Sequence, residues 1–234
     1  MTSRGRIFSE VTFMTEKQPL PEDSLNLSKI FHEIKNPLTL INSSLQFIEA
    51  DHPEVRDFRF WNQTMRELHN LRLMIDELSS LQKSKQIQKT LINLFDFTED
   101  LLEATESFLL ETGTPLTLDC PEDDLDFFAD SVKLQHAVVN LIKNAAEASV
   151  QGSPILLRIV PKGEMLHILV KDHGCGMSPE QRKKAPEPFH TTKADGTGLG
   201  LPVVKGIAEA HGGTLSIESG EGCGTSVCIC LPIR

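Results

Sequence analysis

The stretch FHEIKNPL, residues 31–38, combines a nucleophile with groups that could assist it. A neutral imidazole nitrogen of His32 could attack directly, and the adjacent Glu33 could orient the ring or take its proton. On a helix, Asn36 would share the face of His32, because the two are four residues apart. Pro37 would remove a backbone donor and favour a bend beside the histidine. The alternative is a tolerated kink flanked by solvated polar residues.

A second candidate site lies in NLIKNAAEA, where Asn140 and Asn144 are separated by four residues. Both amides would project from one face of a predicted helix. Asparagine is a poor helix former, so two on one face of an otherwise good helix call for a reason. Their oxygens could bind the magnesium ion of a magnesium–triphosphate. Solvated or internally bonded amides are the alternative.

Two glycine-rich turns follow this helix. DHGCG, residues 172–176, comes directly after the predicted strand LHILVK, and its glycines would let the backbone approach a flat ligand. Asp172 could accept a hydrogen bond from an exocyclic amine, and as a turn residue it is expected to contribute little to the core. GTGLGL, residues 196–201, opens a predicted helix whose N–H groups would attract phosphate. A plain turn and a flexible loop are the respective alternatives.

The segment PEQRKKAPEPFHTTK, residues 179–193, lies between the two turns. It is too polar and too rich in charge and proline to form core. We interpret it as a mobile flap that could close over a bound nucleotide.

Two long helices are expected to carry the first motif. Apolar residues recur at steps of three and four from Ser24 to about Ala50, and again from Phe58 to Leu81. Asp51-His52-Pro53 separates the two patterns. A lone helix hairpin cannot enclose its apolar stripes, so we expect a second copy to complete a four-helix bundle, as a homodimer.

The remainder predicts an α+β fold, with helices on one face of a mixed sheet. Helices are predicted at about 98–111, 131–149 and 199–211. The predicted strands are LTLDC, DFFA, ILLRIV, LHILVK, TLSIES and SVCICLP. We therefore divide the chain into an N-terminal arm or linker (1–23), a helix hairpin (24–88) and an α/β sandwich (89–234).

Composition narrows the function classes. A net charge of −10 argues against nucleic acid as the main partner, and 39% hydrophobic residues are enough for a core. No apolar run approaches the ~20 residues of a membrane span, and a cytoplasmic location is expected. The five cysteines form no CxxC pair and indicate reduced thiols. Cys228 and Cys230 would share one face of a strand, where we interpret them as small buried hydrophobes rather than metal ligands.

The order of these motifs within residues 140–201 resembles the ATP-binding domain, of the GHKL type, of bacterial sensor histidine kinases. FHEIKNPL resembles their H-box, and residues 24–88 resemble their HisKA-type dimerisation and phosphotransfer domain. The PFHTTK and GTGLGL forms are most similar to the nitrogen-regulation type. The resemblance covers about residues 25–234.

The resemblance implies a role for each matching position. His32 would be phosphorylated with Glu33 assisting as base, and Asn36 would position a water that removes phosphate from a response regulator. ATP and Mg²⁺ would be the ligands of the sandwich. Asn144, with Asn140 beside it, would hold Mg²⁺, and Asp172 with Thr225 would bind adenine. The other implied nucleotide-binding residues are Gly174, Gly176, Lys193, Gly196, Thr197, Gly198, Leu199 and Gly200.

The implied function is an ATP-dependent protein-histidine kinase that passes its phosphoryl group to an aspartate of a response regulator, with regulator phosphatase activity. An asparagine cannot act as a base, so Asn140 favours transfer to protein over hydrolysis. A non-catalytic phosphotransfer or scaffold protein and a GHKL-type ATPase remain alternatives. Input would come from an upstream sensory protein or segment. His173 and His136 stand where the family usually has Asn and Gln, which implies altered ATP affinity.

Overall fold

The computed structural model describes residues 21–121, 125–193 and 196–234. The chain begins with a helix hairpin made of α1 (Pro21–Asp51), the short 3₁₀ helix η1 (Pro53–Asp57) and α2 (Trp61–Lys83). Most of the predicted arm lies outside the described residues. Helix α1 starts three residues before the predicted Ser24, with a proline at its first position, where the missing N–H costs nothing.

Only a small cluster of apolar side chains is buried between α1 and α2 in the described residues. Leu38 of α1 packs with Leu68 and Ile75 of α2, and all three are buried. Lys35 Nζ pairs with Asp76 Oδ1 at 2.5 Å and fixes the register of the antiparallel hairpin. Helix α1 runs through Pro37 as one element, and the expected bend there stays a prediction.

The rest of the chain forms an α+β sandwich, which confirms the predicted fold class. Its five-stranded sheet has the order β2-β4-β5-β7-β6, in which β2 and β4 are parallel and the other pairs antiparallel. Strands β1 and β3 form a separate small sheet. The strands are β1 (Thr90–Asn93), β2 (Leu116–Asp119), β3 (Asp126–Ala129), β4 (Ile155–Lys162), β5 (Met165–Lys171), β6 (Thr214–Ser219) and β7 (Thr225–Pro232).

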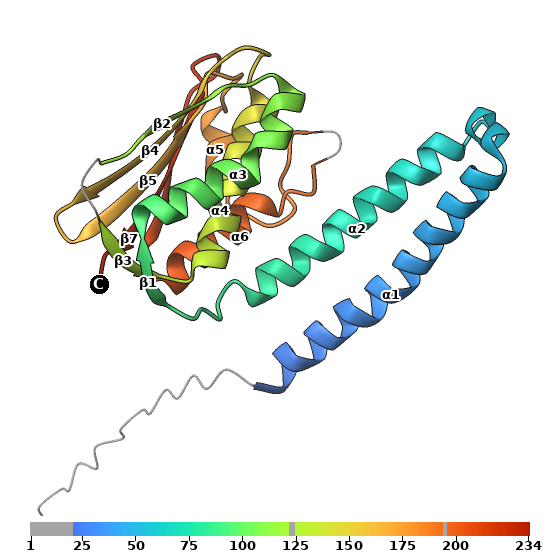
Figure 1. Cartoon of the computed structure of the whole chain (residues 1–234), viewed down its shortest axis with the longest axis horizontal. Coiled ribbons are helices and arrows are strands. Elements are labelled where there is room, and N and C mark those ends of the chain that lie inside the picture. Colours follow the sequence, from blue (N-terminus) through green and yellow to red (C-terminus); the bar gives the residue numbers. More distant parts are fainter. Residues whose placement is uncertain (1–20, 122–124, 194–195) are drawn as a thin grey trace, which may run out of the picture.

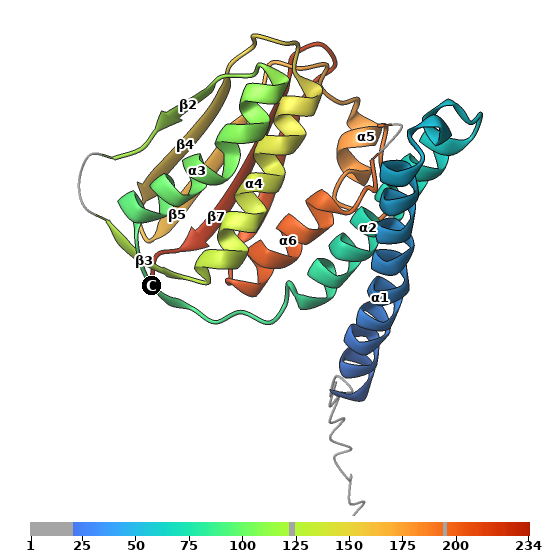
Figure 2. The ribbon, with the colours of Figure 1, turned by 45° about the vertical axis from the view of Figure 1, so that its right-hand side comes forward.

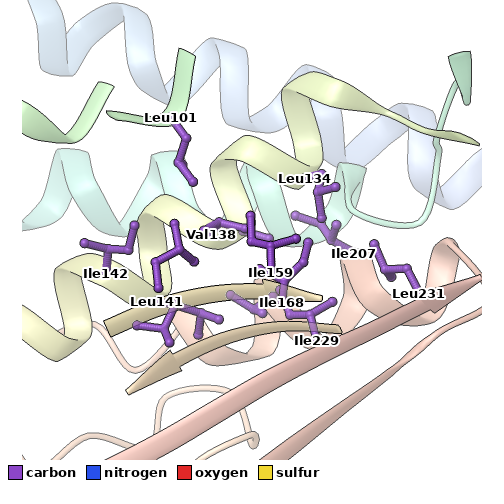
Figure 3. Close-up of a cluster of buried hydrophobic side chains, with 14 of the residues drawn as sticks. Leu101, Leu134, Val138, Leu141, Ile142, Ile159, Ile168, Ile207, Ile229 and Leu231 are labelled. Atoms are coloured by element: carbon purple, nitrogen blue, oxygen red, sulfur yellow. The ribbon is translucent and has the colours of Figure 1, made fainter. Parts of the chain in front are cut away.

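Three helices cover one face of the large sheet: α3 (Leu94–Thr112), α4 (Ser131–Ala148) and α6 (Gly200–Ala210) (Figures 1 and 2). Alternate residues of the strands point into this layer, because side chains of a strand project to opposite faces. Ile159, Ile168 and Ile229 come from three neighbouring strands and meet Val138 and Ile207 of the helices (Figure 3). This core holds α4 and α6 side by side, and these two helices carry much of the predicted site.

Three elements were not predicted, the first being η1 in the break between the two long helices. Strand β1 leads directly into α3, which starts at Leu94 instead of 98 because the Asn93 side chain caps it by accepting from the N–H groups of Phe95 and Asp96. The predicted flap contains a short helix, α5 (Pro179–Lys184), that begins with a capping box between Ser178 and the residue three positions later.

Helix α2, rather than α1, packs against α6 of the sandwich (Figure 2). The contact is close, since a Cβ at Gly206 of α6 would overlap the buried hydroxyl of Ser84, directly after α2. Lys133 Nζ also donates to the carbonyl oxygen of Lys83 at 2.7 Å. Helix α1 lies on the far side of α2 (Figure 1). Within the described residues, no helix is both long and apolar enough to cross a membrane.

Candidate nucleotide-binding site

Asp172 lies directly after β5 and is 5% exposed. Its Oδ1 accepts hydrogen bonds from the N–H groups of Gly174 at 2.8 Å and Thr225 at 3.1 Å. Burial raises the pKa of Asp172, and the two amides counteract part of that rise. The expectation that this aspartate contributes little to the fold is therefore wrong, because it joins the end of β5 to the start of β7. Neither amide engages Oδ2, which can face a ligand.

The wall beside Asp172 is formed by two hydroxyl groups. Ser219 Oγ lies 2.9 Å from Thr225 Oγ1, and it accepts a hydrogen bond from the N–H of Met177 at 2.9 Å. Ser219 thus ties the turn after β5 to the hairpin that joins β6 and β7. Thr225 lies beside Asp172, and its predicted contact with adenine stays a prediction, whereas Ser219 was not predicted.

Gly174 connects this wall to helix α4. A Cβ at this position would overlap the carbonyl oxygen of Ala148, the last residue of α4. The sequence assigned the glycines of this turn to ligand approach, but at Gly174 the close neighbour is the protein itself. The contact places Asp172 near the C-terminal turns of α4, where Asn144 lies.

Asn144 and Glu147 both bond to the side-chain ammonium of Lys193. Lys193 Nζ donates to Asn144 Oδ1 at 3.2 Å and to the carboxylate of Glu147. A Cβ at Gly200, the first residue of α6, would be in van der Waals contact with Asn144 Nδ2. The predicted magnesium ligand, the predicted lysine and the start of the helix after the glycine-rich turn are therefore brought together.

Asn140 has a different environment from Asn144. Its Nδ2 lies 3.3 Å from His136 Nε2, and both residues are half-buried. Burial lowers the pKa of His136, and the charge of Lys143 lowers it further. The other departure, His173, is exposed, with Nδ1 3.3 Å from the carbonyl oxygen of Pro154.

The glycine-rich turn contacts both the flap and α2. The Phe189 N–H donates to the carbonyl oxygen of Gly198 at 3.0 Å, while its side chain is 60% exposed. The Leu199 N–H reaches Thr197 Oγ1 at 3.3 Å. The Thr197 hydroxyl in turn donates to the carboxylate of Glu77 on α2. The glycine-rich turn is therefore hydrogen-bonded on one side to the flap and on the other side to α2.

His32, Glu33 and Asn36 are exposed on α1. Glu33 has Lys29 as a neighbour, with 3.9 Å between Oε1 and Nζ. Because α2 separates α1 from the sandwich, the structure does not bring His32 to Asp172. The sandwich residues of the predicted site come together, and the three hairpin residues form a second group.

Sequence reasoning missed Glu147 and Glu77 as well as Ser219. Glu147 could have been found, because it is three residues after Asn144 on the same helix and so shares its face. Glu77 gave no local signal, since its partner Thr197 is 120 residues away in the chain.

Residues 129–234 match the family described as histidine kinase-, DNA gyrase B-, and HSP90-like ATPases. This segment contains Asp172 and its hydroxyl neighbours, the Lys193 ammonium bonded to Asn144 and Glu147, and the glycine-rich turn. This part of the sandwich is therefore similar to the ATPases of that family.

Over nearly its whole length the chain is related to bacterial sensor histidine kinases. It is 32% identical to sporulation kinase E of Bacillus subtilis, over 97% of this chain and 32% of that protein. It is also 32% identical to the sensor histidine kinase ZraS of Salmonella typhi, over 87% of this chain and 44% of that protein. The chain spans about a third to a half of the length of the curated relatives it matches.

Solved structures give the same picture of the fold. Full-length ShkA, crystallised with AMPPNP, superposes with a TM-score of 0.74 at 19% identity, over 92% of this chain and 46% of that one. The catalytic domain of histidine kinase ThkA covers 62% of this chain and 96% of its own, with a TM-score of 0.57 at 26% identity. The first likeness spans both the hairpin and the sandwich.

Proposed function

We propose that this chain is the kinase core of a two-component system. The sandwich (89–234) binds ATP, the hairpin (24–88) carries the acceptor His32, and the phosphoryl group then passes to an aspartate of a response regulator. The observation that carries the proposal is the position of the Lys193 ammonium, which Asn144 and Glu147 bind together beside the first residue of α6. Such a cradle next to a helix N-terminus suits a metal-bound polyphosphate.

The adenine end of the nucleotide is assigned to Asp172. Its Oδ1 is already held by two backbone amides, so Oδ2 is preorganised to accept from an exocyclic amine. The Thr225 hydroxyl, bonded to Ser219, is positioned to contact a ring nitrogen. A base bound at this wall directs its phosphates toward α4 and the start of α6.

The donors present fit Mg²⁺. Asn144 Oδ1 and the Glu147 carboxylate already converge on a positive charge, the ammonium of Lys193. Oxygen donors of this kind are those that Mg²⁺ prefers, and Asn144 and Glu147 would hold it. Bound there, the ion would neutralise charge on the transferred phosphoryl group. Lys193 would be displaced and is long enough to pair with a phosphate.

The start of α6 supplies the phosphate contacts. Its first N–H groups have no partner one turn earlier, and the positive end of the helix dipole points the same way. Gly200 lies against Asn144, so these amides lie next to the metal ligands. Gly196 and Gly198 belong to the same turn and are assigned to the phosphates with it.

The acceptor lies at a suitable level along the hairpin. The Lys35–Asp76 pair sets the register, so Glu77 is level with the turn of α1 that carries His32. The glycine-rich turn reaches Glu77 from the other side of α2. Phosphoryl transfer therefore requires the sandwich to leave α2 and move around the hairpin, or to serve the histidine of a second copy. Glu33, next to His32, would accept its proton.

A second copy is expected because α1 presents an uncovered apolar stripe. Leu27, Ile34, Ile41 and Ile48 recur every seven residues, and all four side chains are 38–49% exposed. A seven-residue apolar repeat is typical of helix bundles. We assign this stripe to a homodimer interface. A response regulator would dock near His32, where Asn36 could position a water for regulator dephosphorylation, and upstream input would come from a sensory partner or segment.

The proposal is tested by incubating the chain with γ-labelled ATP, with and without Mg²⁺. Label on the protein should be stable in base and labile in acid. Glu147→Ala should need about tenfold more Mg²⁺ for half-maximal labelling, because a metal ligand is lost. Glu106→Ala, which removes an exposed carboxylate on α3, is the control. Steady release of labelled phosphate without labelled protein would favour an ATPase, and absence of ATP binding would favour a scaffold.

A further inference from the structure

Two thiols and an imidazole meet on the face of the sheet that the helices leave open. In the β5–β7 ladder His167 lies directly opposite Cys230, and Cys228 follows two positions along the same strand. Their strand neighbours Ile168 and Ile229 are fully buried on the helix side. Because side chains alternate along strands, His167, Cys228 and Cys230 all project from the opposite face.

The three donor atoms are spaced as ligands of one ion would be. Cys228 Sγ and Cys230 Sγ are 3.7 Å apart, and His167 Nδ1 lies 3.3 Å from Cys230 Sγ and 3.8 Å from Cys228 Sγ. Zinc bonds of about 2.3 Å to sulfur and about 2.0 Å to nitrogen, at tetrahedral angles, separate two sulfurs by ~3.8 Å and sulfur from nitrogen by ~3.5 Å. No other trio of His, Cys, Asp or Glu donors in the described part of the chain converges in this way.

We propose that His167, Cys228 and Cys230 form a site for a thiophilic transition-metal ion, with Zn²⁺ as its natural probe. Two thiolates and one imidazole are the donors of known three-ligand zinc sites, which leave a fourth position for water or another ligand. The site is independent of the proposed kinase activity, since none of its three residues is among those assigned to the nucleotide or to phosphoryl transfer.

The three residues of the site are themselves half-buried. Burial and the adjacent Cys230 raise the pKa of Cys228 to about 12, so without metal this thiol is protonated. A zinc ligand set of this kind consists of two thiolates and a neutral imidazole, so Zn²⁺ would take the place of the thiol protons, which pass to the solvent. No oxidant or reductant takes part.

A metal ion here would connect the two strands that frame Asp172. Cys228 is three residues beyond Thr225 on β7, and His167 is on β5, which ends at the residue before Asp172. Ligation adds a cross-link between strands that otherwise meet through backbone hydrogen bonds. Zinc should therefore raise the thermal midpoint of the sandwich by mass action.

The direct test is a titration of the reduced full-length chain with Co²⁺ and with Zn²⁺. Co²⁺ should give a sulfur-to-cobalt charge-transfer band and the strong d–d bands of a tetrahedral site, and one equivalent of Zn²⁺ should remove both. Cys228→Ser, Cys230→Ser and His167→Gln should each weaken Zn²⁺ binding at least tenfold. Cys223→Ser, at an exposed cysteine of the β6–β7 turn, and Glu147→Ala should keep wild-type affinity.

Alkylation of the unmodified chain provides a readout that needs no variant. With Zn²⁺ bound, Cys230 should react with iodoacetamide more slowly than in the metal-free chain, while exposed Cys175 and Cys223 react equally in both. The proposal is overturned by Zn²⁺ binding that is weaker than millimolar, by binding that depends on Cys223 or Glu147 instead, or by equal alkylation of Cys230 with and without metal. Any of these results would restore the interpretation of the two thiols as small hydrophobic residues.

Discussion

Thr197 of the glycine-rich turn donates a hydrogen bond to the carboxylate of Glu77 on α2. The segment assigned to phosphate binding is therefore attached to the helix hairpin, but through α2 and not through the helix that carries His32. Burial raises the pKa of Glu77, and the hydrogen bond from the Thr197 hydroxyl offsets part of that rise. This hydrogen bond therefore stabilises the ionised form of the carboxylate. The contact holds the sandwich on α2, away from His32 of the same chain (Figure 1).

Replacing Glu77 by alanine should release this arrangement. A hydrogen bond to a charged group contributes about 1.5 kcal/mol or more, so the initial rate of autophosphorylation should rise by up to about tenfold. The control is Glu67→Ala, at an exposed position of the same helix. An unchanged or lower rate in Glu77→Ala, at unchanged ATP affinity, would show that the contact does not restrain transfer.

Asp172→Asn should weaken ATP binding at least tenfold while preserving the fold. The amide oxygen of asparagine can still accept from the two backbone N–H groups, but the anionic acceptor for an exocyclic amine is gone. Asp172→Ala should in addition lose about 1–3 kcal/mol of stability, because buried amides are left without their acceptor. Calorimetric titration with ATP and urea unfolding measure the two effects, with Asp100→Asn on the exposed face of α3 as control. Wild-type affinity in Asp172→Asn would remove this residue from the site.

Ile41→Glu should convert the dimer into monomers. Ile41 is 49% exposed at the middle of the apolar stripe of α1, where a buried charge on each copy would be costly. Gln46→Glu adds the same charge at an exposed position outside the stripe. Sedimentation equilibrium should give a dimer for the wild type and the control. A wild-type chain that is monomeric at high micromolar concentration would contradict the proposed interface.

The sandwich should lose stability as the pH falls below about 6.5, the pKa of histidine in an unfolded chain. His211 is buried, its Nδ1 bonds to the carbonyl oxygen of Ile207, and its Nε2 accepts from the N–H of Asp130. Burial lowers the pKa of His211, so below pH 6.5 the unfolded state binds a proton that the folded state does not. The unfolding free energy then decreases with falling pH, by at most about 1.4 kcal/mol per pH unit for one histidine.

Urea unfolding between about pH 7.5 and 5.5 measures this dependence. Glutamine in His211→Gln keeps one donor and one acceptor for the same partners but does not titrate. The variant should therefore fold, and its unfolding free energy should depend less on pH. His136, whose pKa burial also lowers, should account for part of the remaining slope. Equal slopes in wild type and His211→Gln would contradict the assignment.

Local patterns were enough to predict much of the fold. Alternation along ILLRIV and LHILVK predicts half-buried strands, and both pair in the sheet. The four-residue spacing of Asn140 and Asn144 correctly predicts a helix, although only Asn144 meets Lys193. Strand β1 was missed because four residues run into α3 without a glycine or proline between them.

Other features depend on contacts that no local pattern encodes. The β5–β7 ladder brings His167 to Cys228 and Cys230 across more than sixty residues. The local sequence shows only the two thiols, and their spacing on a strand predicts small buried hydrophobic residues. The same holds for Thr197 and Glu77, which meet only after the sandwich packs on α2. The capping box at Ser178, by contrast, was readable from the sequence and would have predicted α5 inside the flap.

The central claim is that His32 accepts the phosphoryl group of ATP. The most direct measurement compares protein labelling from γ-labelled ATP in the wild type, in His32→Ala and in His69→Ala, which removes an exposed histidine of the same hairpin. The account predicts base-stable, acid-labile label in the wild type and His69→Ala, and none in His32→Ala, with equal ATP affinity in all three. Undiminished label in His32→Ala would contradict it.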